Sequence, residues 1–390
     1  MLELAKILKD IDNLGRERAE SLSGMPEQLS AAAQVISDID AGLSEAQKRI
    51  EDARTSWLVA TFDQSPKDTF DLPEPPAKHA VVAADGSQIM PDKHEVTLCY
   101  LLNASGIILY YGTGERPFAE TVPKLCYQDE DLFERDYGKK RVPVNDKILA
   151  MKRTLAESTE LERMILAAAE SGIPAMALWD GSLIRWALEN EPPDYKERVL
   201  KQYLHTFEVA KELRVPVAGY ISDPGSKDFV NSMRIMLCDQ PRVDCDFCSY
   251  KDGTETPPCD AVGRLKDTTV YRERLSDGKR TVLFTSSSSI LEKYGDHKVY
   301  AFYMDVGSEV VRIEVPEWVA EDRELLDLTH AVCFDQATKG RGYPVALAEA
   351  HEHAVVTGSD RRAFFEMLER SFIKHGARMC RSVKRISKGY

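Results

Sequence analysis

The strongest constraint on the fold is a short motif that occurs twice, Asp-Gly-Ser directly after an apolar run. Residues 80–88 read AVVAADGSQ and residues 175–183 read AMALWDGSL. Each apolar run is too short for a buried helix and therefore predicts an interior strand that ends at an aspartate, Asp85 or Asp180. The glycine after each aspartate permits a sharp turn or a close backbone approach at that point.

The repeated motif favours a binding site at one edge of a sheet. Open α/β sheets place ligands just beyond the carboxyl ends of their strands, so Asp85 and Asp180 are candidates for joint metal binding. Each copy by itself is more typical of an ordinary turn. The metal hypothesis therefore depends on what the rest of the chain supplies.

Composition limits the classes of protein to consider. With 390 residues, of which 43% are hydrophobic and 29% charged, the chain predicts a soluble protein with one large domain and an accessory element. The net charge of -13 argues against a wide basic surface, so nucleic acid would have to bind in a local channel or with metal ions or a partner. No apolar run approaches the ~20 residues of a membrane span, and the N-terminus is amphipathic rather than signal-like. We therefore expect a cytoplasmic protein.

The chain divides by pattern into an arm, a linker and a main domain. Residues 1–62 predict an N-terminal helical arm, with a break at Gly24, that packs on the main domain or on a partner. Residues 63–78 are polar and proline-rich, as in a linker. Residues 79–390 form the predicted main domain.

The main domain alternates strands and helices and predicts an α/β fold. After the first motif, strands over residues 95–103 and 106–111 predict an antiparallel meander. Further strands are expected at residues 215–222, 281–287, 298–305 and 308–315, and helices at residues 148–171, 194–213, 322–339 and 344–356. The first of these helices leads into the strand that ends at Asp180.

That helix carries glutamates on or near its apolar face. On a helical wheel Glu162 falls in the middle of the face, Glu157 at its edge and Glu160 on the polar side. A carboxylate on a core-facing stripe is costly unless it is paired, hydrogen-bonded or metal-bound. Glu162, or alternatively Glu157, can reach the level of Asp180, while the competing interpretation is a side chain that extends to solvent.

Four cysteines cluster in a predicted insert at residues 236–262. They follow the pattern C-x6-C-x2-C-x10-C, and the C-x2-C spacing allows two thiolates to bind one ion. The polar, proline-rich setting suits a small metal-stapled loop. We predict a structural zinc site, with an iron-sulfur cluster or unliganded thiols as alternatives. The four residues are Cys238, Cys245, Cys248 and Cys259.

The C-terminal part adds a tyrosine and a histidine. Residues 342–352 read GYPVALAEAHE, which puts Tyr343 just before a helix and His351 two turns into it. A single helical histidine is usually a surface residue. Lys227, after the strand at residues 215–222, is either a phosphate contact or a solvated loop lysine. No P-loop pattern is present, so any ATP-driven motor must be another chain.

One enzyme class with a similar motif is disfavoured. Phosphatases of the haloacid-dehalogenase type also carry Asp-Gly-Ser or Asp-Gly-Thr after a strand, but they need a nucleophilic aspartate two residues earlier. Ala83 and Leu178 occupy those positions.

From about residue 77 to the C-terminus the chain resembles the NurA family of nucleases. The resemblance rests on AADGSQ, the helix before ALWDGSL, ISDPGSK, VVRIEVPEWV and above all GYPVALAEAHEHAVV. It implies an RNase H-like core with a mixed sheet flanked by helices, and a homodimer enclosing a central channel. It also implies manganese-dependent DNA cleavage, as a 5′–3′ exonuclease and single-strand endonuclease, with a hexameric HerA-type translocase in DNA-end processing.

The resemblance also implies roles for individual residues. The family's two aspartates correspond to Asp85 and Asp180, its tyrosine to Tyr343 and its histidine to His351, while its glutamate fits Glu162 best and Glu157 next. The aspartates would be central ligands for Mn²⁺, or alternatively Mg²⁺, and the glutamate would complete one ion. His351 would bind a second ion or orient water, and Tyr343 would hold the scissile phosphate. The helical arm and the cysteine insert depart from shorter relatives.

A non-enzymatic interpretation stays open. The same fold would then serve as an adaptor for DNA ends or a translocase, with the arm and the insert as binding elements. DNA binding would survive the substitution Asp180→Ala, whereas a nuclease would lose cleavage while remaining folded.

Overall fold

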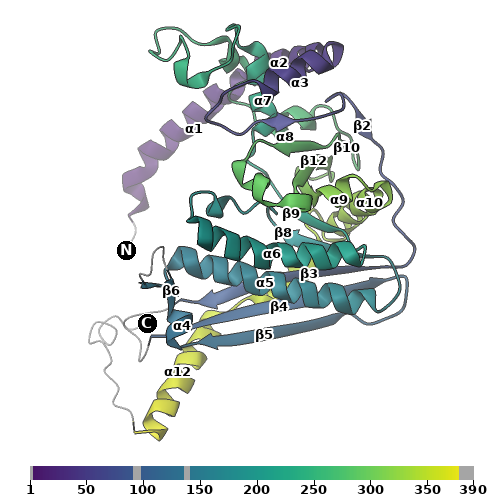
Figure 1. Cartoon of the computed structure of the whole chain (residues 1–390). Coiled ribbons are helices and arrows are strands. Elements are labelled where there is room, and N and C mark those ends of the chain that lie inside the picture. Colours follow the sequence, from purple (N-terminus) through teal and green to yellow (C-terminus); the bar gives the residue numbers. More distant parts are fainter. Residues whose placement is uncertain (1–2, 91–97, 136–140, 377–390) are drawn as a thin grey trace. The chain divides into compact units, whose positions relative to one another are not determined.

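The computed structural model describes residues 3–90, 98–135 and 141–376, which belong to two compact units (Figure 1). The first unit comprises Met1–Leu72, Ile221–Ser288 and Val299–Ile313; the second comprises Pro73–Tyr220, Ser289–Lys298 and Glu314–Tyr390. The chain passes between the units several times, so this division differs from the consecutive arm, linker and domain expected from the sequence. Within the described ranges, no helix has the length and apolar character needed to cross a membrane.

The second unit is built on a mixed sheet. Its strands are β3 (His79–Ile89), β4 (Tyr100–Tyr111), β5 (Phe118–Cys126), β8 (Ala175–Asp180) and β9 (Val217–Ile221). They lie in the order β9-β8-β3-β4-β5, in which β3 pairs in parallel with β8 and antiparallel with β4. A separate hairpin joins β6 (Phe133–Arg135) and β7 (Arg141–Pro143). The predicted α/β class with a mixed sheet is confirmed.

One part of the predicted meander is wrong. The strands expected at residues 95–103 and 106–111 are a single strand, β4, and residues 91–97 lie outside the described residues. Gly106, the first residue of the second expected strand, lies inside β4, where a Cβ atom would come 2.6 Å from Glu160 Oε1. The third strand of the meander is β5, which is exposed along almost its whole length and therefore lacks an apolar run.

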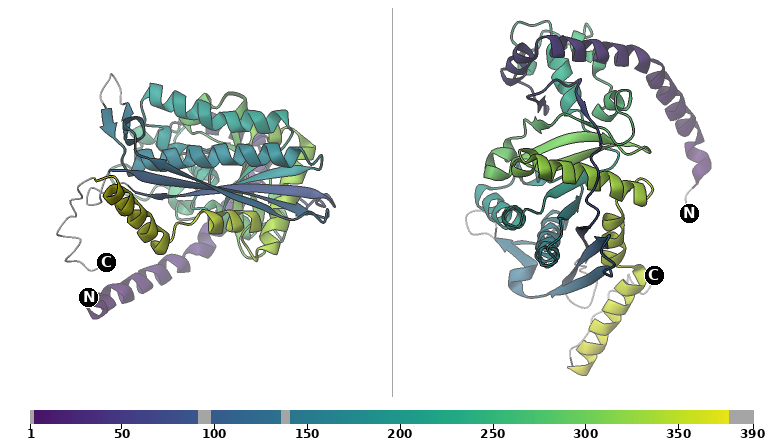
Figure 2. Two further views of the ribbon diagram at one scale, coloured as in Figure 1. Left: turned by 90° about the horizontal axis from the view of Figure 1, so that it is seen from below. Right: turned by 90° about the vertical axis from the view of Figure 1, so that its right-hand side faces the viewer.

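Helices cover both faces of this sheet. Figure 2 (left) shows α5 (Asp146–Ala169) and α6 (Pro193–Glu212) on one face and α11 (Val345–Ala354) on the other. The remaining helices of the unit are α4 (Asp129–Leu132), α9 (Glu317–Ala320), α10 (Arg323–Lys339) and α12 (Gly358–Lys374). Side chains cap the N-termini of α5 and α10. Asn145 accepts a hydrogen bond from Ile148 N in α5, and Asp322 accepts one from Leu325 N in α10. The predicted helix spans are confirmed to within a few residues, and α12 is an addition.

Helix α5 is buried on two sides because it packs against the sheet and against α6. The contact between α5 and α6 includes Ser158 Oγ and Thr206 Oγ1, which lie 2.8 Å apart. Glu160, expected on the polar side, is therefore only 5% exposed and pairs with Arg163. A single apolar stripe was too simple a description of this helix.

The first unit has a helical core and a small sheet. Its helices are α1 (Leu8–Ser23), α2 (Met25–Ala41), α3 (Leu43–Glu51), α7 (Asp228–Leu237) and α8 (Asp267–Arg272). Its strands are β1 (Ala60–Thr61), β2 (Thr69–Phe70), β10 (Arg280–Thr281), β11 (Phe284–Ser286), β12 (Val299–Asp305) and most of β13 (Val310–Pro316). Apolar residues of α2 and α3 share one core with α7 and the strands, whereas the described residues of α1 are exposed. The predicted linker contains β2, which pairs with β10.

Candidate functional site

The two motif aspartates lie side by side in the second unit. Parallel pairing between β3 and β8 ends at Ala84 and Trp179, so Asp85 and Asp180 are the next residues of adjacent strands. Strand β8 ends at Asp180, and Gly181 turns the chain with a φ of +86°. Strand β3 instead continues to Ile89 along β4, so the expectation that both strands end at their aspartates is wrong for Asp85. What ends at both aspartates is the parallel pairing.

His351 is held against Asp85. Its Nδ1 lies 2.7 Å from Asp85 Oδ2. Helix α11 is fixed on this face by hydroxyl and amide donors from β3 and β4: Ser105 Oγ donates to Ala350 O at 2.6 Å, and Asn103 Nδ2 and Ser87 Oγ both donate to Ala354 O. Ser105 is the residue opposite Asp85 in the β3–β4 ladder. The sheet that carries the aspartate therefore also positions the helix that carries the histidine.

Tyr343 is the partner of Asp180. Its hydroxyl interacts with the Asp180 carboxylate, and its ring packs edge-on against Tyr220 at 5.9 Å between centroids. Burial, followed by the nearby charges of Asp180 and Asp85, raises the Tyr343 pKa above its usual range, so the phenol stays neutral. Partial burial and the Asp85 charge also raise the pKa of Asp180, although the residue keeps solvent exposure and Tyr343 acts in the opposite direction.

Glu157 is the helix carboxylate at this site. It is 8% exposed, and a Cβ atom on Gly86 would lie 2.7 Å from its Oε1. Burial raises the pKa of Glu157 to about 7, a net value to which the charges of Asp85 and Asp180 add and from which the neighbouring Arg153 subtracts. The absence of a side chain on Gly86 thus allows a third carboxylate to approach the strand next to Asp85.

Glu162, the first choice from the sequence, lies elsewhere. Thr206 Oγ1 donates to its Oε2 at 3.2 Å, and His205 Nε2 lies 3.8 Å from its Oε1. Both partners belong to α6. The structure therefore brings together Asp85, Asp180, Tyr343 and His351 with Glu157, the alternative glutamate, because Glu162 faces α6.

Glu314 contributes to this region and was missed in the sequence. It is 1% exposed, and Ser182 Oγ and Leu183 N donate to its Oε2 at 2.7 and 2.8 Å. Ser182 Oγ in turn accepts from Ile184 N at 3.0 Å. This network fixes the turn after Asp180. A glutamate inside the apolar run VVRIEV was the available signal, because buried carboxylates require partners.

The donor types at the site suit a hard divalent ion. Carboxylate oxygens with one imidazole are the ligands that Mn²⁺ accepts. Among the residues that the structure describes, no group of three or more His, Cys, Asp or Glu is arranged so that it could hold a metal ion. Asp85, Asp180 and Glu157 influence each other electrostatically without forming a complete protein cage.

The cysteine cluster lies in the first unit, in the segment that follows α7. Burial, and then the nearby thiols of Cys238, Cys248 and Cys259, raise the pKa of Cys245. All four are free, half-buried thiols. In the part of the chain that the structure describes, they do not form a group that could hold a metal ion, so the zinc prediction gains no support.

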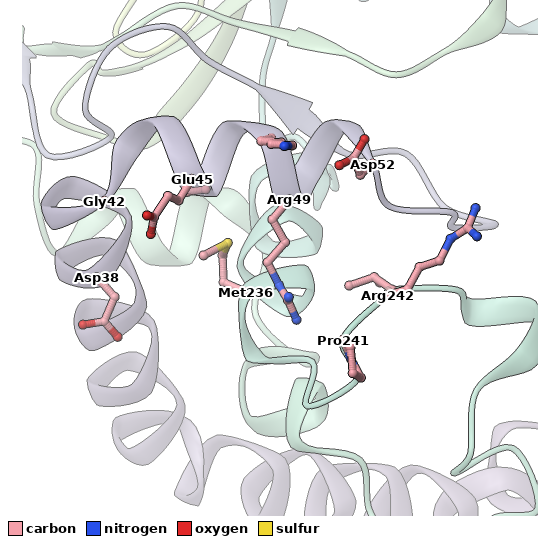
Figure 3. A pocket seen from close by; sticks show the side chains of 11 residues that line it. Asp38, Gly42, Glu45, Arg49, Asp52, Met236, Pro241 and Arg242 are labelled. Atoms are coloured by element: carbon pink, nitrogen blue, oxygen red, sulfur yellow. The ribbon is translucent and has the colours of Figure 1, made fainter.

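Lys227 also belongs to the first unit, where its Nζ donates to Gly263 O at 2.8 Å. The same unit has a cavity of about 700 Å³ lined by residues of α2, α3 and the segment after α7 (Figure 3). Its lining mixes acidic and basic groups, and Arg49 points toward Pro241 and donates to Cys238 O. None of the carboxylates described above lines it.

Comparisons with known proteins identify the family. No curated protein matches the chain. The crystal structure of the NurA nuclease from Sulfolobus solfataricus is similar at 14% identity and a TM-score of 0.47, covering 92% of this chain and 98% of that one. A crystal structure of NurA with manganese is similar at 12% identity and a TM-score of 0.35, covering 77% of this chain and 90% of that one. The model of the NurA domain matches residues 79–356, well over half of the sequence, and the chain therefore belongs to the NurA domain family.

Proposed function

We propose that the protein is a metal-dependent nuclease that hydrolyses phosphodiester bonds in DNA, with Mn²⁺, or alternatively Mg²⁺, as its ion. The observation that carries the proposal is the adjacent placement of Asp85 and Asp180, with Glu157 beside them. His351 contacts one aspartate and Tyr343 the other. Membership of the NurA domain family supports the same reaction.

The residues fit a divalent ion. Burial, and after it the repulsion of the neighbouring carboxylates, raises the pKa of Asp180 and of Glu157, and a bound cation would offset that repulsion. Magnesium-type sites commonly use one or two carboxylates together with water and substrate phosphate oxygens. An incomplete set of protein ligands is therefore compatible with binding. When bound, the ion would supply activation of water and stabilisation of the leaving oxygen.

The side chains have separate roles in this proposal. Asp85 and Asp180 hold the ion, and Glu157 replaces Glu162 as the third carboxylate. His351 is oriented by Asp85 and keeps a side chain that is 62% exposed, from which it can orient water or contribute a ligand. Tyr343, kept neutral by its raised pKa, would turn its one hydroxyl proton from Asp180 to the scissile phosphate when DNA binds.

Two elements of the proposal rest on the family resemblance. These are a homodimer around a central channel, and a HerA-type translocase as the partner in DNA-end processing. Cleavage polarity as a 5′–3′ exonuclease, together with single-strand endonuclease activity, belongs to the same group of predictions.

The test is cleavage of end-labelled single- and double-stranded DNA with Mn²⁺, Mg²⁺ or a chelator. We expect metal-dependent cleavage by the wild type and its loss in Asp85→Ala, Asp180→Ala and Glu157→Gln. Glu162→Gln is the matched control and should cleave like the wild type. Equal cleavage by all variants would indicate a contaminant, and DNA binding without cleavage by the wild type would favour the adaptor.

A further inference from the structure

Helix α5 carries two arginine–glutamate pairs with matching surroundings. Arg153 Nε lies 3.0 Å from Glu157 Oε1, and Arg163 Nη2 lies 2.6 Å from Glu160 Oε1. Each glutamate is buried over a strand glycine, Glu157 over Gly86 and Glu160 over Gly106. The pairs differ in what else the arginine contacts.

Arg163 is engaged within the protein through Nε and Nη2. Its Nε and Nη2 donate to the two oxygens of Glu160 at 3.1 and 2.6 Å, and Nη2 also donates to Glu120 at 2.8 Å. Arg153 makes its closest approach to Glu157 through Nε, and that buried nitrogen makes no hydrogen bond. In residues 3–90, 98–135 and 141–376, Arg153 donates no hydrogen bond. A guanidinium offers five donors, so most of this group is open.

Arg153 also lies close to the strand segment that carries Asp85. Its Cγ would be 3.0 Å from a Cβ atom on Gly86, the residue after Asp85, and its side chain is 38% exposed. Arg185 also acts electrostatically on Glu157, but its Nε and Nη2 are buried and its guanidinium stacks on Trp179 and Tyr203. Of these two cations, Arg153 is the one that a ligand can reach.

We propose that Arg153 binds a backbone phosphate of DNA at the Asp85–Asp180 edge, and that Glu157 holds its guanidinium in place when DNA is absent. The inference rests on the proposed function, because it assumes that DNA is the substrate. With a net charge of -13, phosphate binding has to depend on a few local cations. A planar guanidinium with open donors matches phosphate oxygens in a bidentate manner.

The test is binding of a fluorescent single-stranded oligonucleotide to metal-free protein in chelator, over a range of salt concentrations. Arg153→Gln should weaken binding roughly fivefold at low salt and reduce the slope of log K against log [salt] by about 0.7, the value for one lost phosphate contact. Arg153→Lys should keep the slope, because the charge remains. Arg163→Gln, on the same helix and about 15 Å away, should bind like the wild type.

A second comparison separates phosphate binding from an effect on Glu157. In the Glu157→Gln background, Arg153→Gln should weaken DNA binding by the same factor as in the wild type. No further weakening would mean that Arg153 acts only through Glu157, and the inference would be wrong. An unchanged salt slope in Arg153→Gln, or a wild type that does not bind the oligonucleotide, would also overturn it.

The outcomes distinguish this inference from the nuclease proposal. A wild type that binds DNA with the predicted dependence on Arg153, but does not cleave with Mn²⁺, would contradict the nuclease and leave the phosphate contact standing. If the wild type cleaves DNA with Mn²⁺ and Arg153→Gln leaves the salt slope unchanged, the nuclease proposal stands and the phosphate contact of Arg153 is contradicted.

Discussion

The two Asp-Gly-Ser segments are identical in sequence but differ in structure. In the first, all three residues lie inside β3, and the segment remains paired with β4 through Ile89. In the second, Asp180 ends β8 and Gly181 turns the chain in the left-handed region, with a φ of +86°. The aspartates still become neighbours, because both follow the last parallel pair of β3 and β8.

The glycines and serines of the two segments therefore have different functions. Gly86 makes room for Glu157, whereas Gly181 supplies a backbone conformation. Ser87 binds a carbonyl of α11, and Ser182 binds the buried carboxylate of Glu314. The first segment is a strand that contacts α5 through Gly86 and α11 through Ser87, whereas the second segment forms a turn. The same motif can thus deliver a carboxylate to the same sheet edge by two routes.

Among the predicted substitutions, we expect the largest effects on DNA cleavage from His351, the partner of Asp85, and Tyr343, the partner of Asp180. His351→Ala removes the group that contacts Asp85, and Tyr343→Phe removes the hydroxyl that interacts with Asp180. We expect each variant to lose cleavage on the order of 10- to 100-fold, as for groups that orient metal ligands. Steady-state kinetics should show Tyr343→Phe affecting DNA turnover at saturating metal, while excess Mn²⁺ partly restores His351→Ala. The reverse pattern would contradict the assigned roles.

Glu157 makes the first segment sensitive to pH. Its pKa rises from 4.5 to about 7 on burial, so the folded protein holds an extra proton between these values. In chelator, the free energy of unfolding should therefore fall as pH rises from about 4.5 to about 7, by on the order of 3 kcal/mol. Glu157→Gln should remove this part of the decline, as measured by denaturant unfolding across that range.

Two controls limit the interpretation of the pH series. Burial raises the pKa of Asp267 to about 7 as well, but this residue is present in every variant and cancels in the difference. Glu162→Gln should keep the wild-type dependence on pH. If Glu157→Gln and the wild type decline equally, Glu157 is not the titrating group.

Replacing Gly86 or Gly181 with alanine should lower the stability of the protein, for a different reason at each position. In Gly86→Ala the new Cβ atom would meet Glu157 Oε1 at 2.7 Å and Arg153 Cγ at 3.0 Å, whereas at Gly181 the space is open but φ is +86°. Each change should cost about 1–2 kcal/mol in thermal unfolding.

A second substitution tells the two costs apart. Glu157→Ala should relieve the strain of Gly86→Ala by removing the side chain that it meets. Gly181→Asn should be better tolerated than Gly181→Ala, because asparagine adopts left-handed conformations more readily. Relief of Gly181→Ala by truncating a neighbouring side chain would disprove the turn role.

The smallest contrast concerns the serines. Ser87→Ala leaves Asn103 Nδ2 donating to Ala354 O at 2.9 Å, so the cost should be about 1 kcal/mol or less. Ser182→Ala removes a donor to buried Glu314 and the acceptor used by Ile184 N and Trp186 Nε1, and should cost about 2 kcal/mol. Chemical denaturation measures both. Equal costs would mean that Glu314 is compensated elsewhere.

Much of this architecture follows from local patterns in the chain. Apolar runs of strand length locate β3 and β8, and stretches with helical periodicity locate α5, α6, α10 and α11. These signals are local, because a strand or helix depends mainly on the side chains within its own span. Asp85 and Asp180 could be selected for the same reason, since each follows such a run, whereas Tyr343 and His351 were selected through the resemblance to the NurA family. The exposed strand β5 and the continuity of β4 had no local signal.

Only the three-dimensional packing decided how the site is completed. Glu157, Glu160 and Glu162 lie on one helix within two turns, and their environments differ because α5 contacts the sheet and α6 at once. A helical wheel assumes one buried face, so it could not choose Glu157. Glu314 and Arg153 are likewise defined by residues far away in the sequence. Carboxylate positions, cation access and the fit of a glycine depend on distances between segments, and those distances exist only once the chain has folded.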